Sequence, residues 1–297
     1  MKTLFRPILA YGLIEEDLPN LKFPLILQSK LDGIRCIILE GRVLSRKLKL
    51  IPNKFIRDRL EHHKFDTPAL IDGELIIEGK TFNEIQSAVM SEEGEPNFIY
   101  KVFDCLKEWN SVGYEQRLNS LSFIRHPNIE FLNSITVHNL EELLEWESYI
   151  LKDGYEGIIL RSPNAPYKFG RSTLKEQSLM KFKHFQDSEA IILSSNALLS
   201  NTNELEQDEL GYAKRSSRQV DLIAEEKLGS WNVMDCNKES PFYNGIFNIG
   251  TGFDNDQRLE FWLKRNEMVN RIIKYKYQLS GSKNKPRLPI FLGFRKD

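Results

Sequence analysis

The spacing of apolar and polar positions predicts a mixed α+β fold for the first 187 residues. Short apolar runs bounded by turn residues predict strands at 23–28, 70–77, 98–106, 155–160 and 179–185, and a hairpin at 35–46. Apolar residues three and four positions apart predict helices at 51–64, 81–90, 114–125 and 139–152. The last helix is the clearest, because Asn139 can cap its start and Gly154 can end it.

The pattern changes near residue 187. One stretch, 254–266, has helical spacing, and the other apolar runs predict strands at 190–193, 229–233, 245–249, 274–279 and 289–294. Five strands with one helix in roughly 110 residues are typical of an OB-type barrel. We therefore expect two domains, 1–187 and 188–297. The polar insertion at about 201–228 is too long for an ordinary connection, and we expect it to stay mobile until a partner orders it.

The composition is that of an ordinary globular protein able to bury a core. The 297 residues are 41% hydrophobic and 28% charged, with a formal net charge of -1. Residues 264–297 hold ten Lys or Arg against two acidic residues, and residues 165–185 hold five against Glu176. Such basic stretches are typical of a protein with one nucleic-acid face, although chance clustering on solvated faces is the alternative.

Cysteine usage and apolar run lengths bear on the compartment. The three cysteines are far apart and lack metal-ligand spacing, so we expect reduced thiols and a cytoplasmic location. No stretch approaches transmembrane length, and Arg6-Pro7 interrupts the charged start of the chain. We therefore expect neither a membrane span nor a signal peptide.

The segment Lys30-Leu31-Asp32-Gly33-Ile34-Arg35 directly follows the first predicted strand. A lysine amine becomes a nucleophile when it is neutral, and burial or nearby positive charge favours that form. Asp32 has the chemistry to hold a metal or a sugar hydroxyl, Gly33 allows close approach, and Arg35 can bind a phosphate through two N–H groups. On these residues alone, a hairpin entry with a solvated lysine is the simpler explanation.

Further strands carry residues that an apolar core does not need. Glu74 and Glu156 place carboxylates in otherwise apolar strands, where each requires a hydroxyl, an arginine or a metal. Phe103 lies near a strand end, where its ring can stack on a base or pack in the core. Lys181 and Lys183 share one strand face, which is either a solvated edge or a phosphate clamp.

Taken in order, these segments resemble the covalent nucleotidyltransferase superfamily of ATP-dependent DNA ligases and messenger-RNA capping enzymes, most closely the minimal ligases of viruses and phages. The resemblance covers nearly the whole chain. It rests on the segments 30–35, 45–46, 72–75, 103–104, 156–160, 167–176, 181–183, 211–216, 250–253 and 287–289. It implies an ATP-grasp-like nucleotidyltransferase domain of antiparallel sheets with helices, followed by an OB-fold β-barrel.

The resemblance also implies an activity, the sealing of 3′-OH/5′-phosphate nicks in duplex DNA through a lysyl-AMP. Lys30 would attack the α-phosphorus of ATP, AMP would pass to the 5′-phosphate, and the 3′-hydroxyl would displace it. The implied nucleotide and nick-phosphate contacts are Lys181 and Lys183 on the α-phosphate, Glu74 on the ribose, Phe103 on adenine, Arg295 on pyrophosphate, and Arg35 with Arg46 on the nick phosphate. The implied ligands of Mg²⁺ or Mn²⁺ are Glu156 and Asp32, and the implied DNA contacts are Arg171, Lys214, Arg215, Arg218 and Arg287.

Two alternatives remain at this point. A guanylyltransferase or RNA ligase would share the fold, and a nick-binding module whose catalysis has lapsed would share its shape. The chain departs from the family at Arg295-Lys296-Asp297, because a basic residue usually follows the acidic one there. This departure bears on the efficiency of the first step. We expect ATP to be used in preference to NAD, and we expect a monomer that acts on nicked duplex DNA.

Overall fold

The computed structural model describes residues 5–61, 70–106, 112–123, 126–183, 185–216, 222–278 and 284–295. The chain divides into two compact units. Unit 1 comprises Met1–Lys183 with Glu209–Gly211, and unit 2 comprises His184–Asp208 with Tyr212–Asp297. In the described part of the chain, no helix combines the length and the apolar character needed to cross a membrane.

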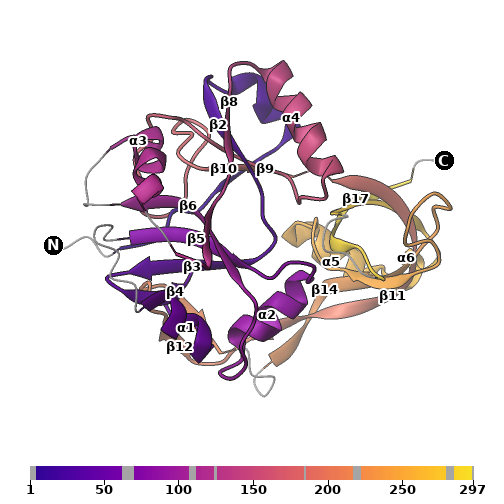
Figure 1. Ribbon diagram of the computed structural model, residues 1–297. Coiled ribbons are helices and arrows are strands. Elements are labelled where there is room, and N and C mark those ends of the chain that lie inside the picture. Colours follow the sequence, from indigo (N-terminus) through magenta and orange to yellow (C-terminus); the bar gives the residue numbers. More distant parts are fainter. Residues whose placement is uncertain are drawn as a thin grey trace. The chain divides into compact units, whose positions relative to one another are not determined.

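Unit 1 contains two sheets, and the first has α4 (Leu140–Lys152) packed on one face (Figure 1). Its strands are, in order across the sheet, β1 (Tyr11–Leu13), β10 (Met180–Phe182), β9 (Ile158–Arg161), β2 (Leu25–Ser29) and β8 (Ser134–Val137). Leu143 and Ile150 of α4 share a buried cluster with Leu25 and Leu27 of β2. The predicted cap is confirmed, because Asn139 Oδ1 accepts from the N–H of Glu142 at 2.9 Å.

The second sheet of unit 1 carries α1 (Lys54–Glu61) and α2 (Phe82–Met90) against one face (Figure 1). Its strands are, in order, β4 (Arg42–Ser45), β3 (Ile34–Leu39), β5 (Leu70–Ile76), β6 (Ile99–Leu106) and β7 (Ile129–Phe131). Glu40 and Gly41 have φ angles of 50° and 77°, so the predicted hairpin has its expected two-residue turn. After β6 the chain forms α3 (Tyr114–Asn119) and a 3₁₀ turn, η2 (Ser120–Phe123).

Strand alternation sends the polar residues of both sheets to the faces opposite the helices. Leu25 and Leu27 of β2 pack in the cluster that contains α4, so Gln28 lies on the other face, and Lys30 continues that face beyond the strand. In the second sheet Ile71 and Leu75 pack beneath the helices, and Asp72 and Glu74 therefore lie on the opposite face. A third buried cluster joins the two inner faces and contains Ile8, Ile37, Leu70, Leu106, Tyr167 and Leu179.

A buried ion-pair network also joins the two sheets. Asp104 of β6 is fully buried and accepts from Arg117 Nε at 2.8 Å, and it forms a second ion pair with Arg161 of β9. Arg117 also donates to the carbonyl oxygens of Val112 and Ala165 at 2.7 and 2.9 Å. A buried charge without partners is costly, so the burial of Asp104 depends on its ion pairs with these arginines.

Unit 2 contains a five-stranded antiparallel sheet with α5 (Asn255–Leu263) and α6 (Arg265–Met268). The strands are, in order, β15 (Ile246–Ile249), β14 (Leu222–Asp235), β11 (Gln186–Asn201), β16 (Ile272–Gln278) and β17 (Arg287–Phe294). Trp231 is fully buried and lies 5.1 Å from Phe261 and 5.3 Å from Phe291 between ring centroids. The five strands and the α5 helix correspond to the predicted OB-type arrangement.

The two edge strands of this sheet approach each other through one isolated bridge, Thr251 with Ile290. The N–H of Phe291 donates to the Thr251 carbonyl oxygen at 2.9 Å. Gly252 allows this approach, because a Cβ there would lie 2.3 Å from the Phe291 oxygen. Among the described residues the edges share no continuous ladder, so the predicted barrel is not fully closed by hydrogen bonds.

The insertion near residues 201–228 contains regular structure in its described part, which the apolar pattern did not predict. Its ordering by a partner stays a prediction. The strands β11 and β14 continue pairing outward as far as Asn201 with Leu222. Beyond them, β12 (Leu205–Gln207) and β13 (Ala213–Arg215) form a separate hairpin. Backbone pairing along a two-stranded ribbon satisfies N–H and C=O groups without a core. The sequence of such a ribbon therefore has no apolar pattern from which its strands could be predicted.

Replacing Asp104 with Ala tests the network between the two sheets of unit 1. The substitution would leave the guanidinium groups of Arg117 and Arg161 buried without their carboxylate, so we expect the free energy of unfolding to fall by about 3–5 kcal/mol. Denaturant titration of the purified chain measures the change. Glu93→Ala, which removes an exposed partner of Lys54, is the control and should leave the denaturation midpoint nearly unchanged. Equal midpoints for the two variants would contradict the role assigned to Asp104.

Candidate active site

Lys30 follows β2 and is held by backbone pairing to the segment before β9. Its N–H donates to the Gly157 carbonyl oxygen at 2.8 Å. Gly157 has a φ of 150°, and a Cβ there would lie 2.3 Å from the Phe182 oxygen, so the close approach of residue 157 to the end of β10 requires glycine. The Lys30 ammonium group donates to the Leu31 carbonyl oxygen at 3.1 Å and forms an ion pair with Glu156 Oε2. Lys30 is therefore at a strand end, as predicted, with its amine next to a carboxylate.

Glu156 bridges two lysines. Its Oε2 pairs with Lys30 and its Oε1 with Lys183, while its own side chain is only 1% exposed. Burial acts to raise the pKa of Glu156, but the charge of Lys30 and the hydrogen bonds from Lys183 and Lys30 lower it overall. The sequence predicted that this carboxylate would need a hydroxyl, an arginine or a metal, and the partners it has are two ammonium groups.

Lys181 lies on the same inner face of the strand as Lys183, and it makes no ion pair within the described residues. Burial lowers its pKa, and the positive charges of Lys30, Arg171 and Arg46 lower it further. The pKa of Lys183 is also lowered, chiefly by burial. These cations together outnumber Glu156, and the cluster has the charge expected of a site that takes a polyanion.

Gly33 and Glu74 meet at the start of β3 in the second sheet. The N–H of Gly33 donates to Glu74 Oε1 at 3.0 Å. A Cβ on residue 33 would lie 2.3 Å from Ile76 Cδ1 and 2.4 Å from the Leu75 oxygen, which confirms the prediction that Gly33 allows close approach. Burial raises the pKa of Glu74, although the charge of Lys30 opposes this shift. Glu74 therefore lies near Lys30, and its second oxygen, Oε2, accepts no hydrogen bond from the described residues.

Arg35 has a protein partner that the sequence reasoning missed. Its Nε and Nη2 donate to the two oxygens of Asp72 at 2.9 and 2.5 Å, and its Nη1 donates to the Ile8 carbonyl oxygen at 2.7 Å. Asp72 also accepts from the Tyr167 hydroxyl at 2.7 Å. The sequence contained a signal for this partner, because Asp72 stands two residues before Glu74 and the two therefore lie on the same face of the strand.

Phe103 lies between two arginines. Its ring centroid is 5.8 Å from Arg35 Cζ and 5.5 Å from Arg161 Cζ. Its carbonyl oxygen accepts from the Tyr114 hydroxyl at 2.8 Å, and the same hydroxyl lies 2.8 Å from Gln28 Oε1. The ring is half-buried, and this leaves part of it available for stacking.

The predicted metal ligands are less clearly grouped. Asp32 is half-buried beside Lys30 in the chain, and Glu156 already accepts from two lysines. Within the ranges that the structure describes, no three His, Cys, Asp or Glu side chains are grouped to hold a metal. Carboxylate oxygens suit Mg²⁺ chemically, but a protein cage for it is not formed by these residues.

The predicted DNA contacts are spread along the chain. Arg171 donates to the Ala10 carbonyl oxygen at 2.7 Å, and Lys214 and Arg215 lie exposed on β13. Arg287 begins β17, and Arg218 lies outside the described residues. Arg295 forms an ion pair with Glu189 at 3.0 Å, and Lys296-Asp297 also lie outside the described residues.

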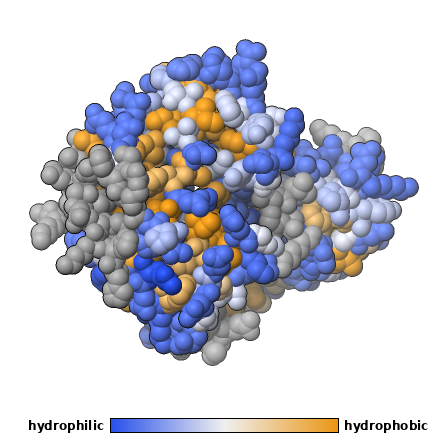
Figure 2. Space-filling model, in the orientation of Figure 1, coloured by the Kyte–Doolittle hydropathy of each residue, from blue (hydrophilic) through white to orange (hydrophobic). Residues whose placement is uncertain are grey.

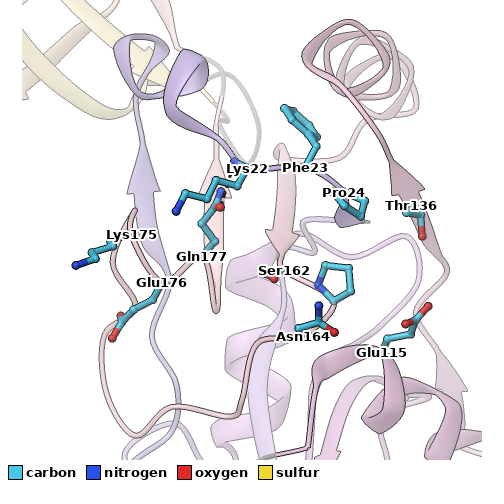
Figure 3. A pocket seen from close by; sticks show the side chains of 11 residues that line it. Lys22, Phe23, Pro24, Glu115, Thr136, Ser162, Asn164, Lys175, Glu176 and Gln177 are labelled. Atoms are coloured by element: carbon cyan, nitrogen blue, oxygen red, sulfur yellow. Dashed lines mark hydrogen bonds between the residues drawn. The ribbon is translucent and has the colours of Figure 1, made fainter.

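A separate cavity of about 450 Å³ lies elsewhere in unit 1 (Figure 3). Its lining includes Lys22, Ser162, Asn164 and Gln177, and the Lys22 N–H donates to Gln177 Oε1 at 3.1 Å. None of the predicted nucleotide contacts lines it. This cavity is therefore separate from the cluster of charged residues around Lys30. On the face that Figure 2 shows, hydrophobic residues gather toward the middle of unit 1 and hydrophilic residues surround them.

Comparison with known proteins places this geometry in a family. A model described as the ATP dependent DNA ligase domain matches residues 7–183, and a DNA ligase OB-like domain model matches residues 225–295. A DNA ligase of Haemophilus influenzae is 24% identical over 272 residues, which are 90% of this chain and 85% of the relative. A DNA ligase of African swine fever virus is 26% identical over 186 residues, and the match spans 57% of this chain but only 43% of the viral protein.

Solved structures give the same result. The Chlorella virus DNA ligase-adenylate is 33% identical, covers 99% of both chains and has a TM-score of 0.55. A Lig E DNA ligase has a TM-score of 0.71 at 23% identity and supports the fold alone. The nucleotidyltransferase and OB expectations are confirmed at the level of fold. Because the ligase domain model matches more than half of its residues, the chain belongs to the ATP-dependent DNA ligase family, whose members form phosphodiester bonds.

Proposed function

We propose that the chain seals 3′-OH/5′-phosphate nicks in duplex DNA and carries AMP on Lys30. The observation that supports this most directly is the pairing of Lys30 and Lys183 with one buried carboxylate, Glu156, with Lys181 on the same strand face as Lys183. Three amines around one carboxylate leave net positive charge, which suits the phosphates of ATP. Membership in the ATP-dependent DNA ligase family supports the same activity.

In the first step the Lys30 Nζ forms a bond to the α-phosphorus of ATP, and the bond from that phosphorus to pyrophosphate breaks. The Lys30 ammonium group first loses a proton to solvent, which frees the nitrogen lone pair for the attack, and a second proton leaves the nitrogen as the N–P bond forms. The neutral phosphoramidate nitrogen therefore no longer pairs with Glu156 as an ammonium group. Lys181 and Lys183 neutralise charge on the α-phosphate oxygens. Positioning and charge neutralisation supply most of the acceleration in transfers at phosphorus, and these residues provide both.

In the later steps AMP leaves the lysine and then the DNA. A 5′-phosphate oxygen attacks the phosphorus of lysyl-AMP and releases Lys30. The 3′-hydroxyl then attacks the 5′-phosphorus and releases AMP, which completes the phosphodiester. The contacts we assign are the ribose to Glu74, adenine to Phe103, the nick phosphate to Arg35 and Arg46, and pyrophosphate to Arg295.

A divalent ion, Mg²⁺ or Mn²⁺, fits the carboxylate chemistry of Glu156 and Asp32. When bound, it would supply charge neutralisation at the phosphates. Glu156 Oε2, which accepts from Lys30, would be the oxygen of this residue to hold the ion, since Lys183 pairs with Oε1.

We assign nicked duplex DNA as the partner of a monomer that acts in a reducing cytoplasm. The candidate phosphate contacts are Arg171, Lys214, Arg215, Arg218 and Arg287. The absence of disulfides among Cys36, Cys105 and Cys236 agrees with a reducing compartment.

A guanylyltransferase or an RNA ligase is the second candidate, because the same fold supports both. The ATP-dependent DNA ligase match favours the leading proposal. Incubation with each labelled nucleotide identifies a guanylyltransferase, because it would label with GTP, and sealing of nicked DNA against nicked RNA separates the two ligases. A nick-binding module without catalysis would label with none of the nucleotides.

Lys30→Ala should abolish covalent labelling by ATP, because it removes the attacking amine. Lys30→Arg should also abolish it, because a guanidinium group stays protonated. The measurement is the transfer of radiolabel from α-labelled ATP to the chain, and Lys54→Ala, at an exposed lysine on α1, serves as the control. Labelling of Lys30→Ala at the wild-type level would falsify the assignment of Lys30.

Lys181→Ala and Lys183→Ala should each slow ATP labelling by at least about tenfold, which corresponds to roughly 1.4 kcal/mol of lost transition-state stabilisation. The initial rate of lysyl-AMP formation measures this. Lys101→Ala is the matched control, because Lys101 also lies on a strand but pairs with Glu130 at the surface. Rates within twofold of wild type for both site variants would favour a solvated strand edge.

Replacing Lys214 and Arg215 of β13 with Ser should weaken binding to nicked duplex DNA and leave ATP labelling unchanged. Each lost phosphate contact should reduce the slope of log affinity against log salt by about 0.9. Binding titrations across a salt series measure the slope. A double variant of Lys54 and Lys80 removes the same charge from unit 1 and controls for net charge. Identical slopes for the two double variants would exclude the hairpin as a DNA contact.

A further inference from the structure

Four residues from distant segments of unit 1 form a closed ring of hydrogen bonds. The Tyr167 hydroxyl donates to Asp72 Oδ2 at 2.7 Å, and Asp72 accepts from Arg35 Nε and Nη2 at 2.9 and 2.5 Å. Arg35 Nη1 donates to the Ile8 carbonyl oxygen at 2.7 Å. The Ile8 N–H closes the ring by donating to the Tyr167 hydroxyl oxygen at 3.4 Å.

Each polar group of the ring depends on the others for its hydrogen bonds, because burial keeps water from replacing them. Ile8 and Asp72 are fully buried, and Tyr167 is 8% exposed. Without the hydroxyl, Asp72 would lose a donor and the Ile8 N–H would lose this acceptor, both out of reach of water. A buried polar group left without a partner costs more than the bond itself contributes, so the hydroxyl constrains both neighbours.

Arg35 is the one member of the ring that reaches the surface of the site. Its side chain is 15% exposed, and its guanidinium carbon lies 5.8 Å from the Phe103 ring centroid. The ring uses three of the five guanidinium N–H groups. One N–H on each of Nη1 and Nη2 therefore remains for a ligand, and the side-on pair with Asp72 fixes the plane in which they point.

We propose that Tyr167 is a positioning residue that acts through Asp72 to orient the Arg35 guanidinium toward the nick phosphate. The proposal rests on the proposed function, which assigns Arg35 to that phosphate. Tyr167 itself touches neither nucleotide nor DNA in this account. Its hydroxyl removes the freedom of Asp72 to rotate, and Asp72 in turn holds two of the three Arg35 nitrogens.

The protonation states agree with this role. Burial raises the pKa of the Tyr167 hydroxyl well above its usual value, and the Asp72 charge raises it further, so the hydroxyl keeps its proton and continues to donate. Burial opposes the charge on Arg35, but Asp72 raises the Arg35 pKa overall. Tyr167 and Arg35 therefore keep the protons that they donate in the ring.

The chain offers a matched control in Tyr100 of β6. This tyrosine is fully buried in the same unit, and its hydroxyl donates to backbone oxygens of Cys36 and Ile71 at 3.0 and 3.2 Å. Replacing it with Phe removes a buried hydroxyl of the same kind without removing a hydrogen bond to Asp72 or Arg35. If both Tyr100→Phe and Tyr167→Phe lose sealing activity to the same extent, the loss comes from the missing buried hydroxyl and not from a change in the orientation of Arg35.

The experiment compares Tyr167→Phe with Tyr100→Phe in the full chain. Labelled ATP gives the amount of lysyl-AMP formed, which counts the folded, active molecules in each preparation. Sealing of a nicked duplex is then measured per active molecule. We expect Tyr167→Phe to seal about tenfold more slowly, the effect of one lost hydrogen bond to a charged group, with lysyl-AMP formation within about twofold of wild type. Tyr100→Phe should match wild type in both.

A double-mutant cycle separates positioning from a purely structural role. In an Arg35→Lys background, Tyr167→Phe should cause less than about a twofold further loss of sealing, because the group that it orients is gone. An equal loss in both backgrounds, or equal sealing by Tyr167→Phe and Tyr100→Phe, would overturn the inference and leave the proposed function standing. A wild-type chain that forms lysyl-AMP but seals no nick, or forms none at all, would overturn the proposed function together with it.

Discussion

The fold of unit 1 depends on one constraint, that every charge on the two inner sheet faces must find a partner. Asp104 satisfies it with Arg117 and Arg161, and the second of these pairs joins β6 to β9. Asp72 satisfies it with Arg35. Burying these groups without partners would cost more than the surrounding apolar contacts contribute. The two sheets are therefore joined in a defined register by ion pairs as well as by the apolar cluster around Ile37 and Leu70.

The same constraint has a different outcome around Lys30. Glu156 is buried and holds two ammonium groups, while Lys181 beside them has no carboxylate within the described residues. Asp72 and Asp104 together face three guanidinium groups, while the three ammonium groups at the strand ends share the single carboxylate of Glu156. The larger excess of positive charge at the strand ends supplies donors for an incoming anion. The site where we propose that the family's chemistry takes place is where unit 1 leaves its charges incompletely paired.

Unit 2 is built on a different principle. Its core is aromatic, with Trp231 among Phe253, Phe261 and Phe291, and Gly252 lets the edge strands approach through a single bridge. Its two longest strands continue past this core as a ribbon with exposed side chains. Backbone hydrogen bonds maintain that ribbon, and its side chains are consequently not committed to packing. Beyond the ribbon lies the separate hairpin of β12 and β13, and Lys214 and Arg215 of β13 are exposed there.

The sequence by itself determined the elements whose signals are local. The apolar periodicity of α4, the Asn139 cap and the turn at Glu40-Gly41 were all predicted, and the order of short polar motifs indicated the family before any contact was known. The strands β1, β7 and β8 were missed, because three or four residues give too short a period to recognise. The outer ribbon was missed because pairing between backbones leaves no apolar pattern.

The tertiary structure alone decided the partners of the charged residues. The sequence marked Arg35 as a phosphate ligand, and the structure shows that Asp72 and the Ile8 carbonyl oxygen already occupy three of its five N–H groups. The sequence could not show that Glu156 lies between two lysines. Residue type and spacing fix which face of a strand a side chain occupies. The residues that this side chain contacts on the facing sheet depend on how the two sheets stack. The packing of residues far apart in the chain decides that stacking.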